Sequence, residues 1–316
     1  PVGACLPIKL TAGHANALLE QDVDFVFLPA MVRLPGDDPC RSYACPYAMA
    51  VPYMIRTRRR QNVLSPVISL TDGGTFIDSF ESCRRALGAS HRDVMTAFRA
   101  ATAAQAEAEE RLTQRLQAGL DAGGYRYVVT VLGKPYAMLD AYINLNLFER
   151  LRRLGILALP LNRLPPASAA GRDTIACDLP WRFCADIARA AVAAAAAEGV
   201  YPIIMSSFGC GPDAFTFRQV EAALKHKPHL FLEFDEHRGE AGLITRLEAF
   251  IDQLDGLEQP PAAAAALPVP VPVRRPAQFP SRSAAVRIPY FSDQAYAYSG
   301  LWKHRGNPVQ VLPRPT

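Results

Sequence analysis

Three cysteines lie where a thiolate could bind a metal ion or an iron–sulfur cluster. Cys5 directly precedes an expected helix, Cys45 lies in a proline-containing loop, and Cys210 lies between an expected strand and the next expected helix. The N-terminus of a helix stabilises a thiolate through its free N–H groups and its dipole. The glycines on either side of Cys210 would let backbone N–H groups approach cluster sulfurs. Three such thiolates suit zinc or an iron–sulfur cluster, although the sequence contains no Cys-x-x-Cys motif.

The other four of the seven cysteines are expected to be bystanders or structural residues. Cys40 is close to Cys45 and is the alternative fourth ligand, but its acidic, loop-like surroundings favour a bystander. Cys83, Cys177 and Cys184 lie in helical or coil stretches without ligand-type neighbours, and a double cluster would need some of them. An odd cysteine count without a secretory signal indicates reduced thiols and a cytoplasmic protein.

Four further side chains are candidates for moving protons near these thiolates. Tyr136 follows the first expected strand of the second half, and Glu233 and His237 end another strand. His14 lies in the first expected helix. Each has a structural alternative as well: packing for the tyrosine, a core or capping role for the histidines, and helix capping for the carboxylate.

The elements that must position these residues indicate an α/β fold. Strands and helices alternate through the second half at the spacing of a parallel, doubly wound sheet. We therefore expect two Rossmann-like lobes facing a cleft, with ligands at the carboxyl ends of the strands. The expected domains are a first α/β lobe with a long helix at 1–120, a second lobe at 121–256, a Pro/Ala-rich linker at 257–283, and the start of a truncated further domain at 284–316.

Hydrophobic periodicity, glycines and prolines define the expected elements. Residues 33–47 are expected to form a loop, and residues 72–74 a turn. Ser90, three residues before Asp93, predicts the start of one long helix that continues to about residue 120. The expected strands are 24–28, 63–70, 125–132, 156–160, 201–205 and 230–234, and the other expected helices are 11–20, 76–87, 144–154, 182–198, 212–224 and 239–254.

Composition excludes several classes of protein. The 316 residues are 50% hydrophobic and 20% charged, with a net charge of +4, which is typical of a globular chain and does not indicate nucleic-acid binding. No apolar run reaches the roughly 18 residues of a membrane span, so no membrane partner is expected. Neither a dinucleotide fingerprint nor a Walker sequence occurs. The chain begins without a methionine, and we expect it to be a fragment.

Several short sequences occur in a characteristic order: CLPIKLTAGH (5–14), SYACPY (42–47), GKPY (133–136), FGCGPD (208–213) and EFDEH (233–237). Together they resemble the dehydratase-like domain of acyl-CoA dehydratase activase-related proteins, relatives of 2-hydroxyacyl-CoA dehydratase subunits and double-cubane cluster proteins. The resemblance covers about residues 1–255. The stretch IPYFSDQA (288–295) is similar to the opening of the next domain in long members.

This resemblance implies a [4Fe-4S] cluster held by Cys5, Cys45 and Cys210, with a double-cubane cluster as the alternative. It also implies an ATP-dependent activator with an actin-like ATPase fold, in cis or in trans, and acyl-CoA or another small molecule as substrate. The expected function is electron transfer or low-potential reduction, with acyl-CoA dehydration as one outcome; whether the chain is itself an enzyme is left open. The alternatives are a non-catalytic domain that carries a cluster or metal for interaction, and a metal-free α/β binding domain.

Overall fold

The structure is a computed structural model that describes residues 3–35, 42–56, 63–70, 73–161, 179–257, 286–288 and 309–311. The chain divides into two compact units, Pro1–Val271 and Pro272–Thr316. The expected linker at 257–283 lies, apart from its first residue, outside the described residues. In the second unit the described residues form one parallel pair, β9 (Val286–Ile288) with β10 (Val309–Val311).

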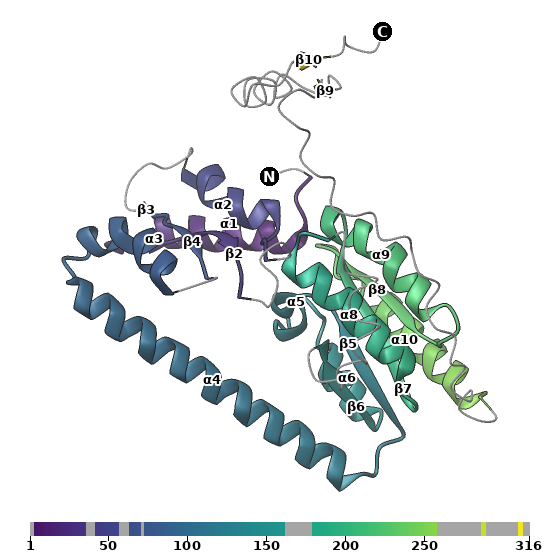
Figure 1. Ribbon diagram of the computed structural model, residues 1–316. Helices are drawn as coiled ribbons and strands as arrows, with labels where there is room; N and C mark the ends of the chain where they lie inside the picture. Colours follow the sequence, from purple (N-terminus) through teal and green to yellow (C-terminus); the bar gives the residue numbers. More distant parts are fainter. Residues whose placement is uncertain are drawn as a thin grey trace. The chain divides into compact units, whose positions relative to one another are not determined.

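A four-stranded parallel sheet forms the centre of the second lobe (Figure 1). Its strands follow the order β6-β5-β7-β8, so the chain runs outward in both directions from β5. Apolar residues of β5 and β7 are fully buried, as expected for strands covered on both faces. This sheet confirms the predicted α/β class with parallel strands. The four strands are β5 (Tyr127–Leu132), β6 (Ile156–Pro160), β7 (Val200–Ser207) and β8 (Leu230–Phe234).

Helices pack on this sheet through amphipathic faces. The alanines of α8 are largely buried, and their small side chains allow a close contact with α9. Leu243, Leu247 and Phe250 recur at helical spacing along α10 and enter the same core as the strands. The helices of this lobe are α5 (Pro135–Leu139), α6 (Leu147–Arg153), α8 (Arg182–Ala196), α9 (Gly211–Leu224) and α10 (Glu240–Asp255).

The first lobe contains a parallel ladder that two prolines interrupt. β1 (Val26–Phe27) pairs with β3 (Val63–Leu64), and β2 (Ala30–Arg33) pairs with β4 (Val67–Ser69). Pro29 and Pro66 separate the two pairs, because proline has no N–H to donate to a ladder. The strand predicted at 63–70 is therefore split into two.

Three helices of the first lobe begin earlier than expected or were not expected. α1 (Leu6–Leu19) begins five residues before the predicted start, and Pro7 suits its first turn because an N–H there has no helical partner. α2 (Pro46–Arg56) begins at the end of the predicted loop and even contains Pro52. α3 (Gly73–Ala86) begins inside the predicted turn at 72–74, so that prediction was wrong.

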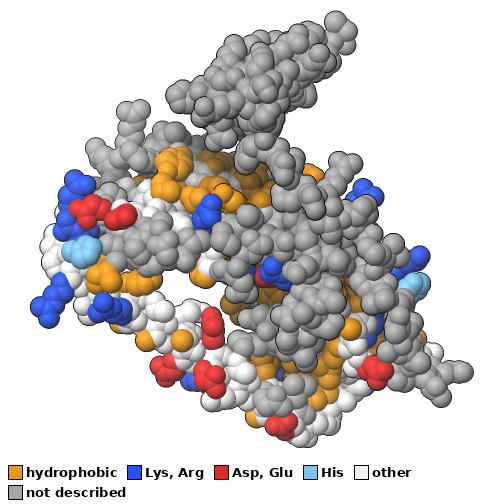
Figure 2. Space-filling model, viewed as in Figure 1, with side chains coloured by type: hydrophobic (Ala, Val, Ile, Leu, Met, Phe, Trp, Pro, Cys, Tyr) orange, Lys and Arg blue, Asp and Glu red, His pale blue; other side chains and the backbone are white. Residues whose placement is uncertain are grey.

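The long helix α4 (His91–Ala122) confirms the expected cap and length. The Ser90 backbone donates to Asp93 Oδ2 at 2.9 Å, and the Asp93 backbone donates back to Ser90 Oγ at 3.2 Å. Residues 99–115 are all exposed, and Figure 2 shows acidic and basic side chains along this helix. No helix in the described part of the chain combines the length and apolar character that a membrane crossing requires.

Candidate functional site

Each of the three candidate ligand cysteines directly precedes the first turn of a helix. Cys5 and Cys210 are the N-cap residues of α1 and α9, and Cys45 precedes α2. Each of these helices has a proline within its first two positions. Each cysteine carbonyl accepts a hydrogen bond from its helix, whose unpaired N–H groups favour negative charge nearby. The local sequence thus places three sulfurs at three helix N-termini.

Contacts far apart in the sequence bring these helix starts toward the second lobe. Leu6 belongs to the core of the four-stranded sheet, whereas the adjacent Cys5 packs with Ala4 and Ile8 in a smaller core beside α2. Lys9 forms an ion pair with Glu236, which follows β8. Cys5 therefore lies where the first lobe meets the carboxyl ends of the second sheet.

The loop that carries Cys45 is held by backbone pairing on both sides. Tyr43 pairs with Arg33 of β2 and with Trp181, which caps α8. The Ala44 N–H donates to the Val32 carbonyl at 2.9 Å. The Arg33 guanidinium also donates to the Tyr43 hydroxyl at 2.8 Å. These bonds fix the backbone immediately before Cys45.

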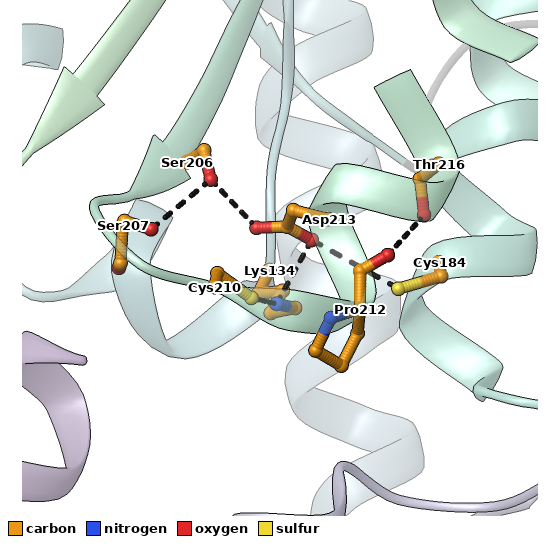
Figure 3. A network of polar contacts seen from close by, with 8 residues as sticks. All are labelled: Lys134, Cys184, Ser206, Ser207, Cys210, Pro212, Asp213 and Thr216. Atoms are coloured by element: carbon orange, nitrogen blue, oxygen red, sulfur yellow. Dashed lines mark hydrogen bonds and ion pairs between the residues drawn. The ribbon is translucent and has the colours of Figure 1, made fainter. Parts of the chain in front are cut away.

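A buried lysine is the central charge of the site. Lys134 follows β5 and is only 5% exposed. Its Nζ donates to Cys210 Sγ at 2.7 Å and pairs with Asp213 Oδ1 at 2.9 Å, as the close-up in Figure 3 shows. Glycine at position 133 allows the end of β5 to pack closely against β7, because a Cβ there would lie 3.0 Å from the Met205 Cβ. The ends of two adjacent strands thus meet at the Lys134–Cys210 contact.

Asp213 fixes this lysine and is itself held by polar side chains. Ser206 Oγ donates to Asp213 Oδ2 at 2.8 Å, and Cys184 Sγ lies 3.9 Å from Asp213 Oδ1 (Figure 3). Ser206, Asp213 and Cys184 are all buried. We call Lys134, Cys184, Ser206, Cys210 and Asp213 the lysine network. A buried carboxylate is stable in such surroundings because each of its oxygens has a donor.

Burial and charge set the proton affinities of the lysine network. Burial alone would lower the pKa of Lys134, but Tyr136, Asp213 and Cys210 together raise it above its usual value, so the ammonium stays charged. Burial raises the pKa of the Cys210 thiol to about 11, and the Lys134 charge opposes that rise. Burial likewise raises the pKa of the Cys184 thiol to about 12.

The Lys134 charge also acts on a second candidate cysteine, Cys5. Burial raises the pKa of the Cys5 thiol; Cys45 adds to the rise, whereas the Ile8 N–H and Lys134 oppose it. Cys5 thus lies within electrostatic reach of both Cys45 and Lys134. Among the described residues, however, no group of three or more His, Cys, Asp or Glu side chains is arranged to hold a metal ion. Cys45 and Lys134 thus both act on Cys5, and Lys134 contacts Cys210, but the described residues contain no compact set of three ligands.

Of the proton-transfer candidates, Tyr136 lies in this neighbourhood. Burial raises the pKa of its phenol and Lys134 opposes the rise, while Cys210 and Cys5 both act on it. The whole residue is 40% exposed, and its ring contacts Phe183 edge-on at 6.4 Å between centroids. The phenol therefore stays protonated at neutral pH and can donate a hydrogen bond from a partly accessible position.

The other three candidates are exposed. His14 lies in the middle of α1, Glu233 lies within β8, and His237 follows β8. The His237 N–H donates to Asp235 Oδ1 at 2.9 Å, which is a local turn contact. In the described part of the chain, no hydrogen bond or ion pair joins these three side chains to the candidate cysteines or Lys134.

The remaining cysteines differ from one another. Cys83 is buried within α3 and Cys184 within α8, each 1% exposed. Cys184 was expected to lack partners, yet the fold places it beside Asp213. Cys40 and Cys177 lie outside the described residues.

Sequence reasoning missed Lys134, Ser206 and Asp213 as site residues. A signal was present, because Lys134 lies at the start of the helix after β5 and Asp213 in the first turn of the helix after β7. Polar residues at the helix starts that follow two parallel strands meet only if those strands are neighbours, and here β5 pairs with β7. That adjacency could not be read from the sequence.

Comparison with known proteins identifies the family of the chain. Residues 1–164, just over half of the chain, match the model of the CoA enzyme activase uncharacterised domain (DUF2229). The matched region contains Cys5, Cys45 and Lys134, whereas Cys210 and Asp213 follow it. No curated protein and no solved structure matches the chain significantly. The chain belongs to the family of the CoA enzyme activase uncharacterised domain.

Proposed function

We propose that this domain binds a [4Fe-4S] cluster through Cys5, Cys45 and Cys210 and transfers electrons at low potential together with an ATP-dependent activator. The observation that carries the proposal is that each of the three cysteines directly precedes a helix and that a buried lysine contacts one of them. Lys134 Nζ donates to Cys210 Sγ at 2.7 Å, and its charge opposes the rise in the pKa of both Cys5 and Cys210. The activase family and the likeness of the short sequences to dehydratase subunits support it further.

The residues fit such a cluster in their chemistry. Thiolates are the usual ligands of iron–sulfur clusters, and Cys5, Cys45, Cys184 and Cys210 are free thiols, which suits a reducing, cytoplasmic compartment. The helix N-termini and Lys134 would offset the negative charge of three thiolates. Because the described residues hold no compact set of three ligands, loading requires the sulfurs of Cys5 and Cys45 to approach Cys210. A double-cubane cluster would need further ligands.

A bound cluster would supply one-electron chemistry at a thiolate-ligated iron. The protein would hold the Cys210 sulfur through Lys134 and keep a proton on the Tyr136 hydroxyl, close to the same charges. The partly exposed tyrosine could then donate a hydrogen bond or a proton to an oxygen of acyl-CoA or another small molecule. Under this proposal the chain acts as a low-potential reductase component or as an acyl-CoA dehydratase-type lyase.

The surface beside Cys210 suits a protein partner. Phe208 and Phe215 precede and follow Cys210 in the sequence and are 65% and 67% exposed. The Phe215 ring packs against Trp181, with centroids 5.8 Å apart. Exposed aromatic side chains are common in protein interfaces, and an electron donor must come close to the cluster. We assign this surface to the activator with an actin-like ATPase fold, in cis or in trans.

The same exposed aromatic residues favour a second candidate function. In this alternative the domain is non-catalytic and carries its cluster or metal ion for interaction within a larger activase-like polypeptide. The two functions differ in whether the cluster is reduced. Mixing the iron-loaded domain with a reduced activator and ATP should bleach the cluster absorbance if it accepts electrons, and should leave it unchanged if its role is structural.

The decisive experiment is iron and acid-labile sulfide analysis after anaerobic purification and reconstitution. The wild type should bind a cluster, Cys210→Ser should lose most of it, and Cys83→Ser should retain it. Cys83 is the matched control because it is a buried cysteine in α3, away from the helix starts. A serine hydroxyl replaces a soft thiolate poorly as an iron ligand. Iron-free wild type, or full iron content in Cys210→Ser, would overturn the proposal.

A further inference from the structure

Three residues with a strained backbone gather in two loops of the second lobe. Leu145, Asn146 and Arg238 have φ angles of 53°, 58° and 52°, and in the described part of the chain they are the non-glycine residues with positive φ. Leu145 and Asn146 end the loop between α5 and α6. Arg238 lies in the loop between β8 and α10. Such strain persists only where surrounding contacts hold it, and it is often found at binding sites.

Side-chain contacts join these two loops. Arg150 Nε donates to the Leu145 carbonyl at 2.9 Å, and the Arg150 guanidinium also pairs with Glu240 at the start of α10. Within the first loop, the buried Asn144 side chain donates to the Met138 carbonyl at 2.7 Å. One arginine thus links the strained part of the first loop to the second loop. The folded structure therefore fixes both loops without a ligand.

The two loops present an arginine that, among the described residues, has no carboxylate partner. The Arg238 guanidinium carbon lies 4.0 Å from the centre of the Tyr142 ring, and both side chains are exposed. The acidic side chains near Arg238 in the sequence have other partners, namely Lys9 for Glu236, Arg150 for Glu240 and the His237 N–H for Asp235. The N–H groups of Arg238 are therefore available to a ligand.

A guanidinium stacked on an aromatic ring is suited to bind an oxyanion. The ring covers one face of the guanidinium, while the N–H donors lie in its plane and match two oxygens of a carboxylate or a phosphate. Leu139, three residues before Tyr142, is 77% exposed and adds apolar surface. We propose that Arg238, Tyr142 and Leu139 bind a small molecule that carries a carboxylate or a phosphate next to an apolar group. This site does not depend on the cluster proposed above.

Four variants separate this role from a structural one. If Arg238 only joined the two loops, its replacement would leave anion binding unchanged. Arg238→Met removes the guanidinium and keeps an apolar stem, whereas Arg238→Lys keeps the charge and loses the paired donors. Leu139→Ala removes the apolar contact alone. Arg99→Met is the matched control, because Arg99 is an exposed arginine on α4.

The experiment is an amide chemical-shift titration of the isotope-labelled full chain, purified without a cluster, at low ionic strength. Acetate and inorganic phosphate probe the oxyanion alone, whereas benzoate and phenyl phosphate add an apolar ring. We expect saturable shifts confined to residues 139–142 and 236–240. Benzoate should bind more tightly than acetate, and phenyl phosphate more tightly than phosphate. The series with the higher affinity identifies the carboxylate or the phosphate as the recognised group.

Arg238→Met should weaken the binding of every probe by at least about tenfold, the usual contribution of a hydrogen bond to a charged group. Arg238→Lys should recover only part of that loss. Leu139→Ala should abolish the advantage of benzoate over acetate and leave acetate binding unchanged. The Arg99→Met variant should bind like the wild type. Absence of saturable shifts in the wild type, unchanged affinity in Arg238→Met, or an equal loss in Arg99→Met would overturn the proposed site.

Discussion

The lysine network and the long helix α4 both join oppositely charged side chains, but in opposite environments. Lys134 and Asp213 come from distant parts of the chain, and their side chains are 6% and 3% exposed. On α4, Arg111 pairs with Glu107 one turn away, and their side chains are 54% and 72% exposed. The exposed pair arises from helical spacing alone, whereas the buried pair exists only in the folded sheet.

The difference shows at which positions a charged pair affects the stability of this protein. The charges of an exposed pair are hydrated whether or not the pair forms, so the pair adds little to the free energy of unfolding. A buried pair cannot recover its lost hydration unless the site opens, so removing one partner leaves an expensive charge behind. The charges of α4 therefore suit a solvated helix surface, and the lysine network suits a site that must hold one geometry.

The largest expected effect would break the buried pair. Asp213→Leu should lower the free energy of unfolding by about 3–5 kcal/mol, because it leaves the Lys134 ammonium buried beside apolar atoms. The double variant Lys134→Met/Asp213→Leu should recover most of that loss. Urea unfolding followed by circular dichroism measures both. If the single and double variants were equally unstable, the pair would not be what stabilises this region.

A smaller effect concerns alkaline pH. Because burial raises the pKa of Cys184 to about 12 from an ordinary value of 9.0, the unfolded chain loses this proton first as the pH rises. The stabilisation is complete below about pH 9 and declines by about 1.4 kcal/mol per pH unit above it. Cys184→Ala should therefore flatten the fall in stability between pH 9 and 10.5, measured by urea unfolding at each pH. If the free energy of unfolding fell equally steeply with pH in the variant, groups other than Cys184 would cause the alkaline loss of stability.

The start of α4 should show a more modest effect. Ser90→Ala removes the hydroxyl that accepts from the Asp93 N–H, and loss of such a cap costs about 1 kcal/mol. Hydrogen exchange of the first-turn amides of α4 should accelerate. Thr102→Ala is the control, since Thr102 lies in the exposed middle of the helix and alanine is the better helix former. Equal acceleration in both variants would contradict the cap.

The smallest effect should come from the exposed pair of α4. Glu107→Gln should change the free energy of unfolding by less than about 0.5 kcal/mol, and high salt should abolish the difference. Urea unfolding at low and high salt concentration tests this. A loss as large as that of Asp213→Leu would remove the contrast between the two regions.

Much of the second lobe was predictable because local pattern and burial agree there. The apolar runs of β6 and β8 have the predicted bounds. The first lobe was less predictable, although its long helix α4 begins at the cap that Ser90 and Asp93 predict. Pro66 splits a continuous apolar run into two strands, and α2 forms despite Pro52 in its interior. The missing N–H of Pro66 breaks the strand locally, whereas α2 tolerates Pro52 in a helix that packs against α1 and β2.

The candidate site likewise contains residues that the sequence identified and residues that it did not. Residue types and helix-start positions identify Cys5, Cys45 and Cys210 as candidates, because proline and glycine mark helix N-termini locally. Lys134 and Asp213 also lie at helix starts that glycine and proline mark, but a lysine or an aspartate at such a position is ordinary on a surface and does not by itself indicate a site. Only the pairing of β5 with β7 buries them against each other and against Cys210. Helix starts depend on a few neighbouring residues, so the three candidate cysteines could be identified from the sequence. Strand adjacency depends on the packing of the whole sheet, so the contact of the Lys134 ammonium with Cys210 could be seen only in the tertiary structure.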